Sequence, residues 1–263
     1  MLIIGEKINS TRRPVQAAVA RRDEAFIHDL AKRQVQAGAG MLDVNCGTLE
    51  DEEPEALAWA VRIAQDAGGV PISIDTPNAC AMEAALKVHR GKPLINSITA
   101  QRERLEGMLP IIKGYSCSVI ALCMNDDGVP ELAEGRVEVA RYLVEALAGV
   151  GVSPPDIYLD PLVEPVSVAP GGVRVVLDTI ERLRELFPEC HIICGVSNVS
   201  FGLPRRSLLN RSFLGMCMAF GADAVIVDPE DRDLMATLRA SDTLLGRDEF
   251  CAQYMAAFHE GLL

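Results

Sequence analysis

Short segments rich in β-branched and aliphatic residues alternate eight times with longer segments of helical period along the 263-residue chain. The strand-like segments cover residues 2–5, 41–45, 71–75, 94–96, 118–123, 157–160, 192–196 and 224–228. Between them, apolar residues recur at helical spacing, as Val137, Ala140, Val144 and Leu147 do, with Glu and Arg on the opposite, solvated face. This alternation predicts parallel strands that are connected by amphipathic helices.

Eight strand–helix units, each about 20 to 40 residues long, predict an α/β fold of the (β/α)8 (TIM) barrel type. An open, doubly wound sheet would show the same alternation. However, such a sheet normally has a glycine-rich nucleotide turn after its first strand, and Gly5-Glu-Lys-Ile-Asn9 is not one. The even spacing leaves no room for an inserted domain, so residues 1–263 are expected to form a single barrel domain.

Composition narrows the class of protein further. Apolar residues make up 49% of the chain and charged residues 24%, which is enough for one large core. The net charge of −12, with no basic run beside aromatic residues, argues against nucleic acid as a partner. No apolar stretch approaches the roughly 20 residues of a membrane span, and no secretory signal precedes the first strand. We therefore expect a cytoplasmic protein whose eight cysteines are mostly reduced core residues.

Carboxylate and amide side chains stand where the strand-like segments end. They are Glu6, Asn9, Asp43, Asn45, Asp75, Asn96, Asn125, Asp160, Asn198 and Asp228, with Ser197 beside Asn198. In a barrel of parallel strands these ends share one face, and barrel enzymes place their sites there. The alternative is that these residues only cap the following helices and stabilise turns, as Asp and Asn do at strand-to-helix junctions.

Other kinds of active site have no clear members in this sequence. His28, His89 and His259 fall in predicted helices, and His191 stands at the start of a strand, the end opposite the expected site. A His-ligated metal or a Ser-His-Asp triad is therefore not expected. The segment Gly195–Val199 differs from a nucleophile elbow at its fifth position, and no phosphate-binding loop is present. We expect no metal ion bound by the chain itself.

A ring of carboxylates and amides suits a neutral heterocycle that is rich in hydrogen-bond donors and acceptors. A pterin presents its 2-amino and N3–H groups as two parallel donors to one carboxylate, and its other polar atoms need partners of mixed type, which amides supply. Sugars and nucleobases also bind Asp and Asn. From the residue types alone, the ligand stays open among these three classes.

Several motifs resemble those of the pterin-binding methyltransferases. The resemblance is to the methyltetrahydrofolate:corrinoid protein methyltransferases, and more distantly to the folate domain of cobalamin-dependent methionine synthase. The motifs are LIIGEKIN at 2–9, LDVN at 42–45, SIDT at 73–76, INS at 95–97, IYLDPL at 157–162, GVSNVS at 195–200 and LNRSFL at 209–214. They follow one another over most of the chain, and the pair DPL and GVSNVS is the most specific.

The resemblance implies a homodimeric barrel that moves a methyl group between N5 of tetrahydrofolate and the cobalt of a corrinoid. The corrinoid, a cobalamin, would be carried on a separate protein that docks at the barrel mouth, because this chain lacks an Asp-x-His-x-x-Gly cobalamin loop. The site residues implied by motif match are Glu6, Asp75, Asn96, Asp160, Gly195, Ser197, Asn198 and Arg206. Among them, Asp75, Asn96 and Asp160 would hold the pterin ring of tetrahydrofolate or 5-methyltetrahydrofolate, and Asn198 would reach N5.

Methyl transfer between N5 and cobalt needs no covalent bond to the protein, so orientation and charge stabilisation carry the catalysis. An Asn amide can donate to N5 or accept from it without changing charge, which suits Asn198 in both directions of transfer. The proton for N5 would come from Asp160 or from water. Phe201-Gly-Leu-Pro204 departs from the polar run that some members of the family have there, which leaves contacts beyond the pterin ring open.

Two alternative functions fit part of the pattern. A dihydropteroate synthase also binds a pterin in such a barrel, but this sequence lacks an Asp-Ser-Phe-type loop after the first strand and a Lys-x-x-x-Arg set for pyrophosphate near the last strands. A noncatalytic folate-binding module would keep Asp75, Asn96 and Asp160 but would need nothing at N5. Asn198 therefore separates an enzyme from a binding module.

Overall fold

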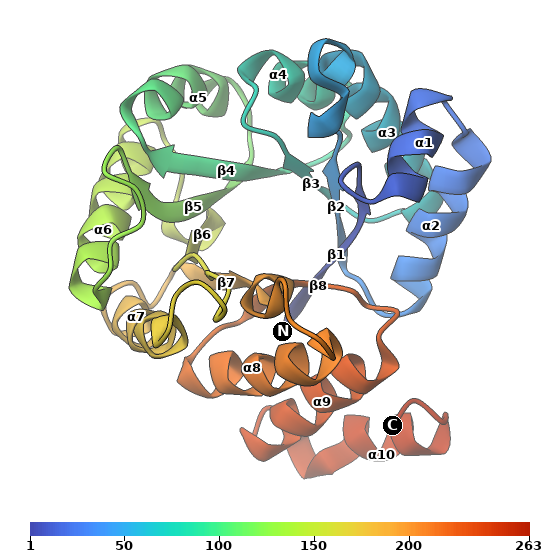
Figure 1. Cartoon of the computed structure of the whole chain (residues 1–263), viewed down its shortest axis with the longest axis vertical. Coiled ribbons are helices and arrows are strands. Elements are labelled where there is room, and N and C mark those ends of the chain that lie inside the picture. The colour runs from blue at the N-terminus through green and yellow to red at the C-terminus, as the bar shows by residue number, and fades with distance from the viewer.

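Eight parallel strands form a closed barrel in the order β1 to β8, and β8 pairs back with β1 (Figure 1). The strands are β1 (Leu2–Asn9), β2 (Met41–Asn45), β3 (Ile72–Asp75), β4 (Leu94–Ala100), β5 (Ser118–Asn125), β6 (Ile157–Asp160), β7 (His191–Gly195) and β8 (Ala224–Val227). This computed structural model describes all residues 1–263. It confirms the predicted (β/α)8 barrel.

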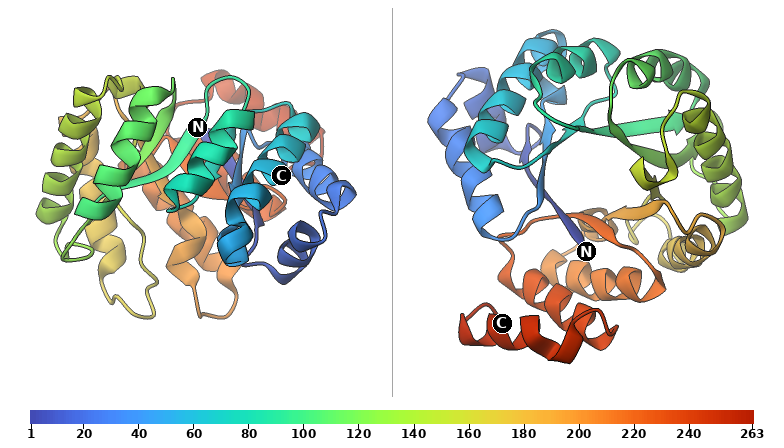
Figure 2. Two further views of the ribbon diagram at one scale, coloured as in Figure 1. Left: turned by 90° about the horizontal axis from the view of Figure 1, so that it is seen from above. Right: turned by 180° about the vertical axis from the view of Figure 1, so that it is seen from behind.

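A ring of helices surrounds the strands. The helices are α1 (Arg13–Ala20), α2 (Glu24–Gln36), α3 (Glu53–Gly68), α4 (Ala79–Val88), α5 (Arg102–Gly114), α6 (Ala133–Gly149), α7 (Gly172–Leu186), α8 (Arg206–Phe220), α9 (Arg232–Leu244) and α10 (Ala252–His259). Asp23, Asn78 and Asp231 cap α2, α4 and α9 by accepting backbone N–H groups of the first turn. Helix α10 lies outside the ring against α9 (Figure 2). No helix is both long and apolar enough to cross a bilayer.

Alternation along the strands separates the core from the barrel interior. Outward-facing residues such as Ile72 and Ile74 are fully buried beneath the helices, in a cluster of 61 buried residues. A separate inner cluster of Ile4, Leu94, Ile120, Ile193 and Ala224 fills the barrel. Two residues further along, the strands present Glu6, Asn96 and Gly195, so polar groups lie above an apolar floor. This alternation places the functional side chains at one mouth.

The predicted boundaries needed small corrections. Strands β1 and β4 extend past the predicted segments to Asn9 and Ala100, because their polar ends still pair with neighbouring strands although they lack the apolar signal of a strand. His89 follows α4 instead of lying within it, and its Nε2 faces the backbone N–H of Ile72 at 3.3 Å. Six of the eight cysteines are buried and none forms a disulfide, as expected.

Candidate active site

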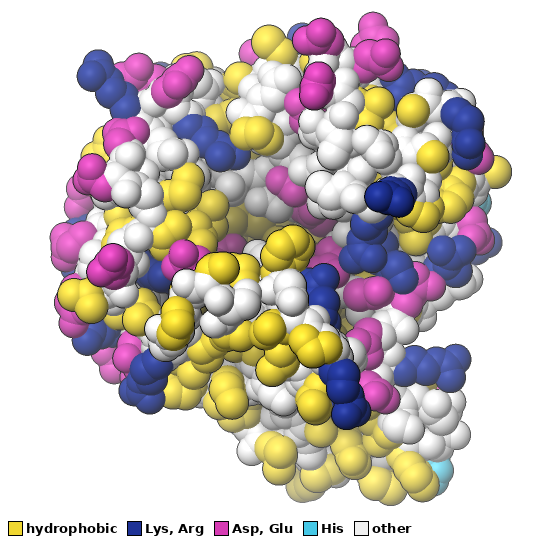
Figure 3. Space-filling model, in the orientation of Figure 1, with side chains coloured by type: hydrophobic (Ala, Val, Ile, Leu, Met, Phe, Trp, Pro, Cys, Tyr) yellow, Lys and Arg dark blue, Asp and Glu magenta, His cyan; other side chains and the backbone are white.

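A cavity of about 790 Å³ opens where the strands end, and Figure 3 shows it as a hollow with acidic groups inside. All eight residues implied by the motifs line this cavity: Glu6, Asp75, Asn96, Asp160, Gly195, Ser197, Asn198 and Arg206. They come from β1, β3, β4, β6, from β7 with the 3-10 turn η3 (Val196–Ser200) that follows it, and from the start of α8. Residues far apart in sequence therefore share one site.

Two carboxylates, the buried Asp43 and the half-buried Asp75, are hydrogen-bonded to two amides at one side of the cavity. Asp43 Oδ1 accepts hydrogen bonds from Ser73 Oγ at 2.6 Å and from Asn96 Nδ2 at 3.0 Å. Asp75 Oδ2 accepts from Asn45 Nδ2 at 3.0 Å. Burial, and secondarily the nearby Asp75 charge, raises the pKa of Asp43 well above its usual range. Burial also raises the pKa of Asp75 to about 6, against the opposing effect of the Asn45 hydrogen bond.

Asp160 closes β6 and is only 9% exposed. Burial raises its pKa to about 7, although the Leu162 N–H donates to its Oδ1 at 2.8 Å and the charge of Arg136 opposes the shift. Arg136, 1% exposed, donates through Nη1 to the carbonyls of Pro161 and Leu162 at 2.8 and 2.7 Å. This buried guanidinium fixes the backbone that orients Asp160. A carboxyl group with such a pKa gains and loses its proton near neutral pH.

Asn198 is exposed in the turn η3 on the cavity wall, and its side-chain amide has no hydrogen-bond partner in the protein. Gly195 lies directly beneath it. A Cβ at Gly195 would come within 3.1 Å of Asn198 Nδ2, which is closer than such contacts normally are. The glycine therefore leaves room for the amide to lie against the end of β7.

The side chains of Glu6, Ser197 and Arg206 are engaged within the protein. Ser197 Oγ donates to both Glu6 oxygens, at 2.9 and 2.7 Å, and Arg12 pairs with Glu6 at 3.0 Å. Burial raises the pKa of Glu6 despite these contacts. Arg206 Nη2 donates to the Ser197 carbonyl at 2.7 Å, and its Nε donates to Ser200 Oγ at 3.0 Å. These contacts hold the turn that carries Asn198.

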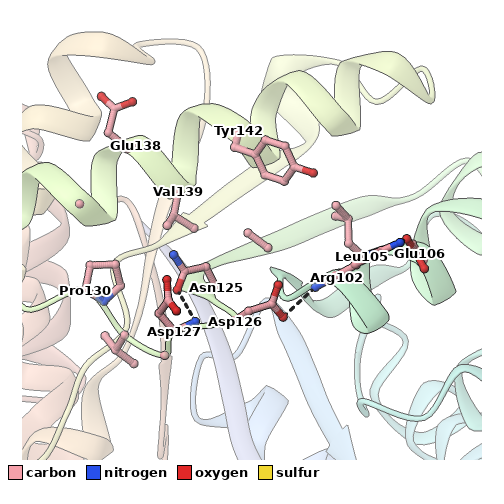
Figure 4. Close-up of a pocket in the computed structure, with 14 residues that line it drawn as sticks. Arg102, Leu105, Glu106, Asn125, Asp126, Asp127, Pro130, Glu138, Val139 and Tyr142 are labelled. Atoms are coloured by element: carbon pink, nitrogen blue, oxygen red, sulfur yellow. Dashed lines mark hydrogen bonds and ion pairs between the residues drawn. The ribbon is translucent and has the colours of Figure 1, made fainter.

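The prediction that Asn125 belongs to the ring was wrong. Its Oδ1 accepts from the Asp127 N–H at 3.0 Å, and its backbone pairs with Gly128 in a tight turn. Asn125 instead lines a second cavity of about 820 Å³ between α5 and α6, together with Val139 and Tyr142 (Figure 4). The alternative reading, a residue that stabilises a turn, holds at this junction.

Arg104 is a cavity residue that the sequence did not indicate. It projects from the first turn of α5 and has no ion-pair or hydrogen-bond partner, and its Nε is buried without one. Its charge acts to lower the pKa of Asp75. Nothing in the sequence distinguishes it from the solvated Arg102 two residues earlier. Asp43 was identified in the ring of strand ends but not among the site residues, although its strand position was a sufficient signal.

A closed barrel whose mouth combines buried carboxylates with amides is typical of a barrel enzyme with a site for a polar ligand. Residues 5–228 match the family model described as pterin binding enzyme. The chain belongs to this family of pterin-binding enzymes, which confirms the family expected from the motifs.

Similar proteins include a methylcorrinoid:tetrahydrofolate methyltransferase of Eubacterium limosum, 35% identical over 263 residues, which are 99% of this chain and 97% of that protein. A methionine synthase of Mycobacterium tuberculosis is 30% identical over 86% of this chain, but the match covers only 20% of that longer protein.

Solved structures with the same fold include two dihydropteroate synthases. The Yersinia pestis enzyme with a pterine-sulfa conjugate has a TM-score of 0.66 at 18% identity, and the match covers 92% of this chain and 94% of that one. The Xanthomonas albilineans enzyme with 7,8-dihydropteroate has a TM-score of 0.66 at 21% identity, over 94% and 93% of the two chains. At these identities the likeness establishes the fold alone.

Proposed function

We propose that this protein is a methyltransferase that moves a methyl group between N5 of tetrahydrofolate and the cobalt of a corrinoid carried on a separate protein. The observation that carries the proposal is the 35% identity to a methylcorrinoid:tetrahydrofolate methyltransferase over nearly the whole of both chains. The dihydropteroate synthase structures show the fold alone, and this chain has no Lys-x-x-x-Arg set for pyrophosphate near its last strands.

The pterin would lie across the cavity floor. Asp75 and Asp160 offer carboxylates to its 2-amino and N3–H donors, and these donors stabilise the ionised form of groups that burial otherwise keeps partly protonated. Asn96 donates an Nδ2–H to Asp43, and its Oδ1 remains available to accept a hydrogen bond from the ring. The hydrogen bond between Asn96 and Asp43 therefore fixes the orientation of the Asn96 amide before the ring binds.

Asn198 would act at N5. As the methyl group leaves N5 for cobalt, N5 takes a proton, and in the reverse direction its lone pair must be free to attack. The Asn198 amide donates to N5 in one state and accepts from it in the other, without a change of charge. Of the two proton sources expected from the sequence, Asp160 and water, water is the one proposed, because a carboxylate that accepts from the 2-amino and N3–H groups lies on the edge of the ring away from N5. The protein contributes position and hydrogen bonds, while the cobalt of the partner protein accepts or gives the methyl group.

The wider assembly belongs to the same proposal. Residues 1–263 would act as one pterin-binding domain, and the corrinoid protein would dock over the open mouth, because the cobalt has to approach N5 from above the ring. A homodimer, a cytoplasmic location and the absence of a resident metal stay predictions from the sequence and the resemblance.

Tetrahydrofolate binding tests the pterin assignment, and methyl transfer tests the reaction. Calorimetric titration with tetrahydrofolate should show saturable binding to the isolated protein. Mixing the protein with methylcobalamin and tetrahydrofolate should give a folate-dependent change in the cobalt absorbance, with 5-methyltetrahydrofolate as product. Absence of saturation at millimolar tetrahydrofolate would remove the pterin assignment.

The pH dependence of binding follows from Asp160. Because its pKa in the free protein is about 7, the carboxyl group holds a proton below that pH and cannot accept from both pterin donors. Affinity for tetrahydrofolate is therefore expected to fall by up to about tenfold per pH unit below 7 and to level off above it. Calorimetry between about pH 6 and pH 8, in buffers of different ionisation enthalpy, should also detect the released proton. An affinity that stays flat across this range would contradict the assignment.

Gly195→Ala is expected to lower the rate of methyl transfer about tenfold or more. The backbone φ of −76° suits alanine, so the fold should tolerate the change within about 1 kcal/mol, but the new Cβ would displace the Asn198 amide. Single-turnover rates and urea unfolding of the variant would measure the two effects. Gly149→Ala is the matched control, because a Cβ there meets no atom within 4 Å. Full activity in the Gly195 variant would show that Asn198 needs no such room.

A further inference from the structure

An aromatic side chain lies exposed on the wall of the mouth. Phe201 is 65% exposed, yet it lines the same cavity as the carboxylates and Asn198. It begins the segment Phe201–Pro204, directly after the turn η3 that carries Asn198. Apolar rings exposed within a binding cavity are candidates for contact with an apolar part of the ligand.

The protein holds Phe201 in place. Its backbone N–H donates to the Asn198 carbonyl at 3.1 Å, and its own carbonyl accepts from Ser167 Oγ at 3.1 Å. The guanidinium of Arg206 lies over the ring, 5.8 Å from its centroid. Gly202 follows with a positive φ of 79°, which turns the chain away directly after the ring. The ring is therefore presented by a fixed turn whose side-chain support is Arg206.

The position of Phe201 relative to Asn198 indicates what it can meet. Three residues in a 3-10 turn advance the chain by about 6 Å, so the ring lies about one turn beyond the Asn198 amide. In tetrahydrofolate, the carbon next to N5 carries the short methylene–amine link to the p-aminobenzoyl ring. With N5 at Asn198, that substituent leaves the pterin on the side of η3.

We propose that Phe201 is a specificity-determining residue that stacks on the p-aminobenzoyl ring of the folate substrate. The inference rests on the proposed function, because it takes N5 to lie at Asn198. Offset or edge-to-face contact between two aromatic rings is favourable beyond the area that it buries. Phe201 therefore adds affinity for a complete folate and none for a bare pterin.

Two ligands separate this role from a structural one. For Phe201→Ala, the Kd for tetrahydrofolate is expected to rise about 5- to 20-fold, while the Kd for 6-methyltetrahydropterin, which lacks the p-aminobenzoylglutamate group, stays within twofold of wild type. Phe201→Tyr keeps the ring and should bind tetrahydrofolate within about threefold of wild type. Phe258→Ala is the matched control: that ring is 63% exposed on α10, outside the cavity, and its loss should change neither Kd.

Three results would overturn the inference. An equal loss for both ligands would mean that Phe201 acts through the turn that carries Asn198. Unchanged binding of both ligands would mean that the Phe201 ring contacts neither of them and is free to contact the partner protein instead. A wild-type protein that binds both ligands equally tightly would show that the p-aminobenzoyl group finds no partner here. All three leave pterin binding, and with it the proposed function, intact. If wild type bound neither ligand, the proposed function would fail as well.

Discussion

Replacing Asn198 by alanine is expected to lower the rate of methyl transfer at least a hundredfold and to change tetrahydrofolate affinity by no more than about threefold. The reason is that the amide is proposed to act on N5 as its charge changes in the transition state, and loss of one such preorganised donor typically costs 10²–10³ in rate. The variant should fold normally, within about 0.5 kcal/mol, because the exposed amide has no hydrogen-bond partner in the protein.

Single-turnover rates with methylcobalamin, beside calorimetric titration of tetrahydrofolate, would separate the two effects of Asn198→Ala. Asn125→Ala is the matched control, because that amide stabilises a turn in the second cavity and should leave the transfer rate unchanged. If the variant lost affinity for tetrahydrofolate, and neither it nor wild type exceeded the uncatalysed rate of methyl transfer, a noncatalytic folate-binding module would be favoured instead.

The sequence could predict the barrel because period-2 and period-3.6 patterns of apolar residues follow from burial. Ile72 and Ile74 face the helices, so Ser73 and Asp75 between and after them must face inward, and the same reasoning places Asn96 and Asp160 at the mouth. The predicted site residues share one cavity for this reason. Their hydrogen-bond partners could not be predicted, since the Asn96–Asp43 contact depends on the register of neighbouring strands.

The positions of side chains that depend on local geometry could not be predicted from the sequence. Asn125 has the same residue type and junction position as the mouth residues, yet a tight turn with Gly128 captures it. Arg136 stands in an amphipathic helix whose arginines were expected on the solvated face, but it is buried and reaches the backbone after Asp160. Arg136 can be buried because loop carbonyls accept its N–H groups, and the position of those carbonyls depends on the tertiary structure, which the local sequence does not show.

Asp160→Asn is expected to have opposite effects on binding and on stability. Loss of a charged hydrogen bond to the pterin donors should weaken tetrahydrofolate binding by roughly 1.5–3 kcal/mol. The ligand-free protein, however, should become more stable at pH 8. In wild type, the pKa of Asp160 is about 7, above the ordinary value of 3.8. Between these two pH values the folded state binds more protons than the unfolded state, so the stability of wild type falls as pH rises through that window. The difference of about 3 pH units corresponds to at most about 4 kcal/mol.

An amide avoids this cost of ionisation and can still accept the Leu162 N–H through Oδ1. Urea unfolding of the ligand-free variant should therefore show a gain of about 1–3 kcal/mol over wild type at pH 8, less than half of that gain near pH 5, and little difference at about pH 4 and below. Asp156→Asn should do the reverse at pH 8. Burial raises the pKa of Asp156, but hydrogen bonds from Lys92 and Ser153 outweigh burial and hold it below the usual range.

The effects of Asp160→Asn on tetrahydrofolate binding and on stability together show whether the carboxylate serves the ligand or the fold. A residue retained for the fold would cost stability when neutralised, as expected for Asp156 at pH 8. If a buried carboxylate is instead kept for binding a ligand, neutralising it should lower the affinity for that ligand and raise the stability of the ligand-free protein. If Asp160→Asn lost stability at pH 8 while tetrahydrofolate bound as before, the carboxylate would serve the turn at Leu162, and the pterin would have to lie elsewhere in the mouth.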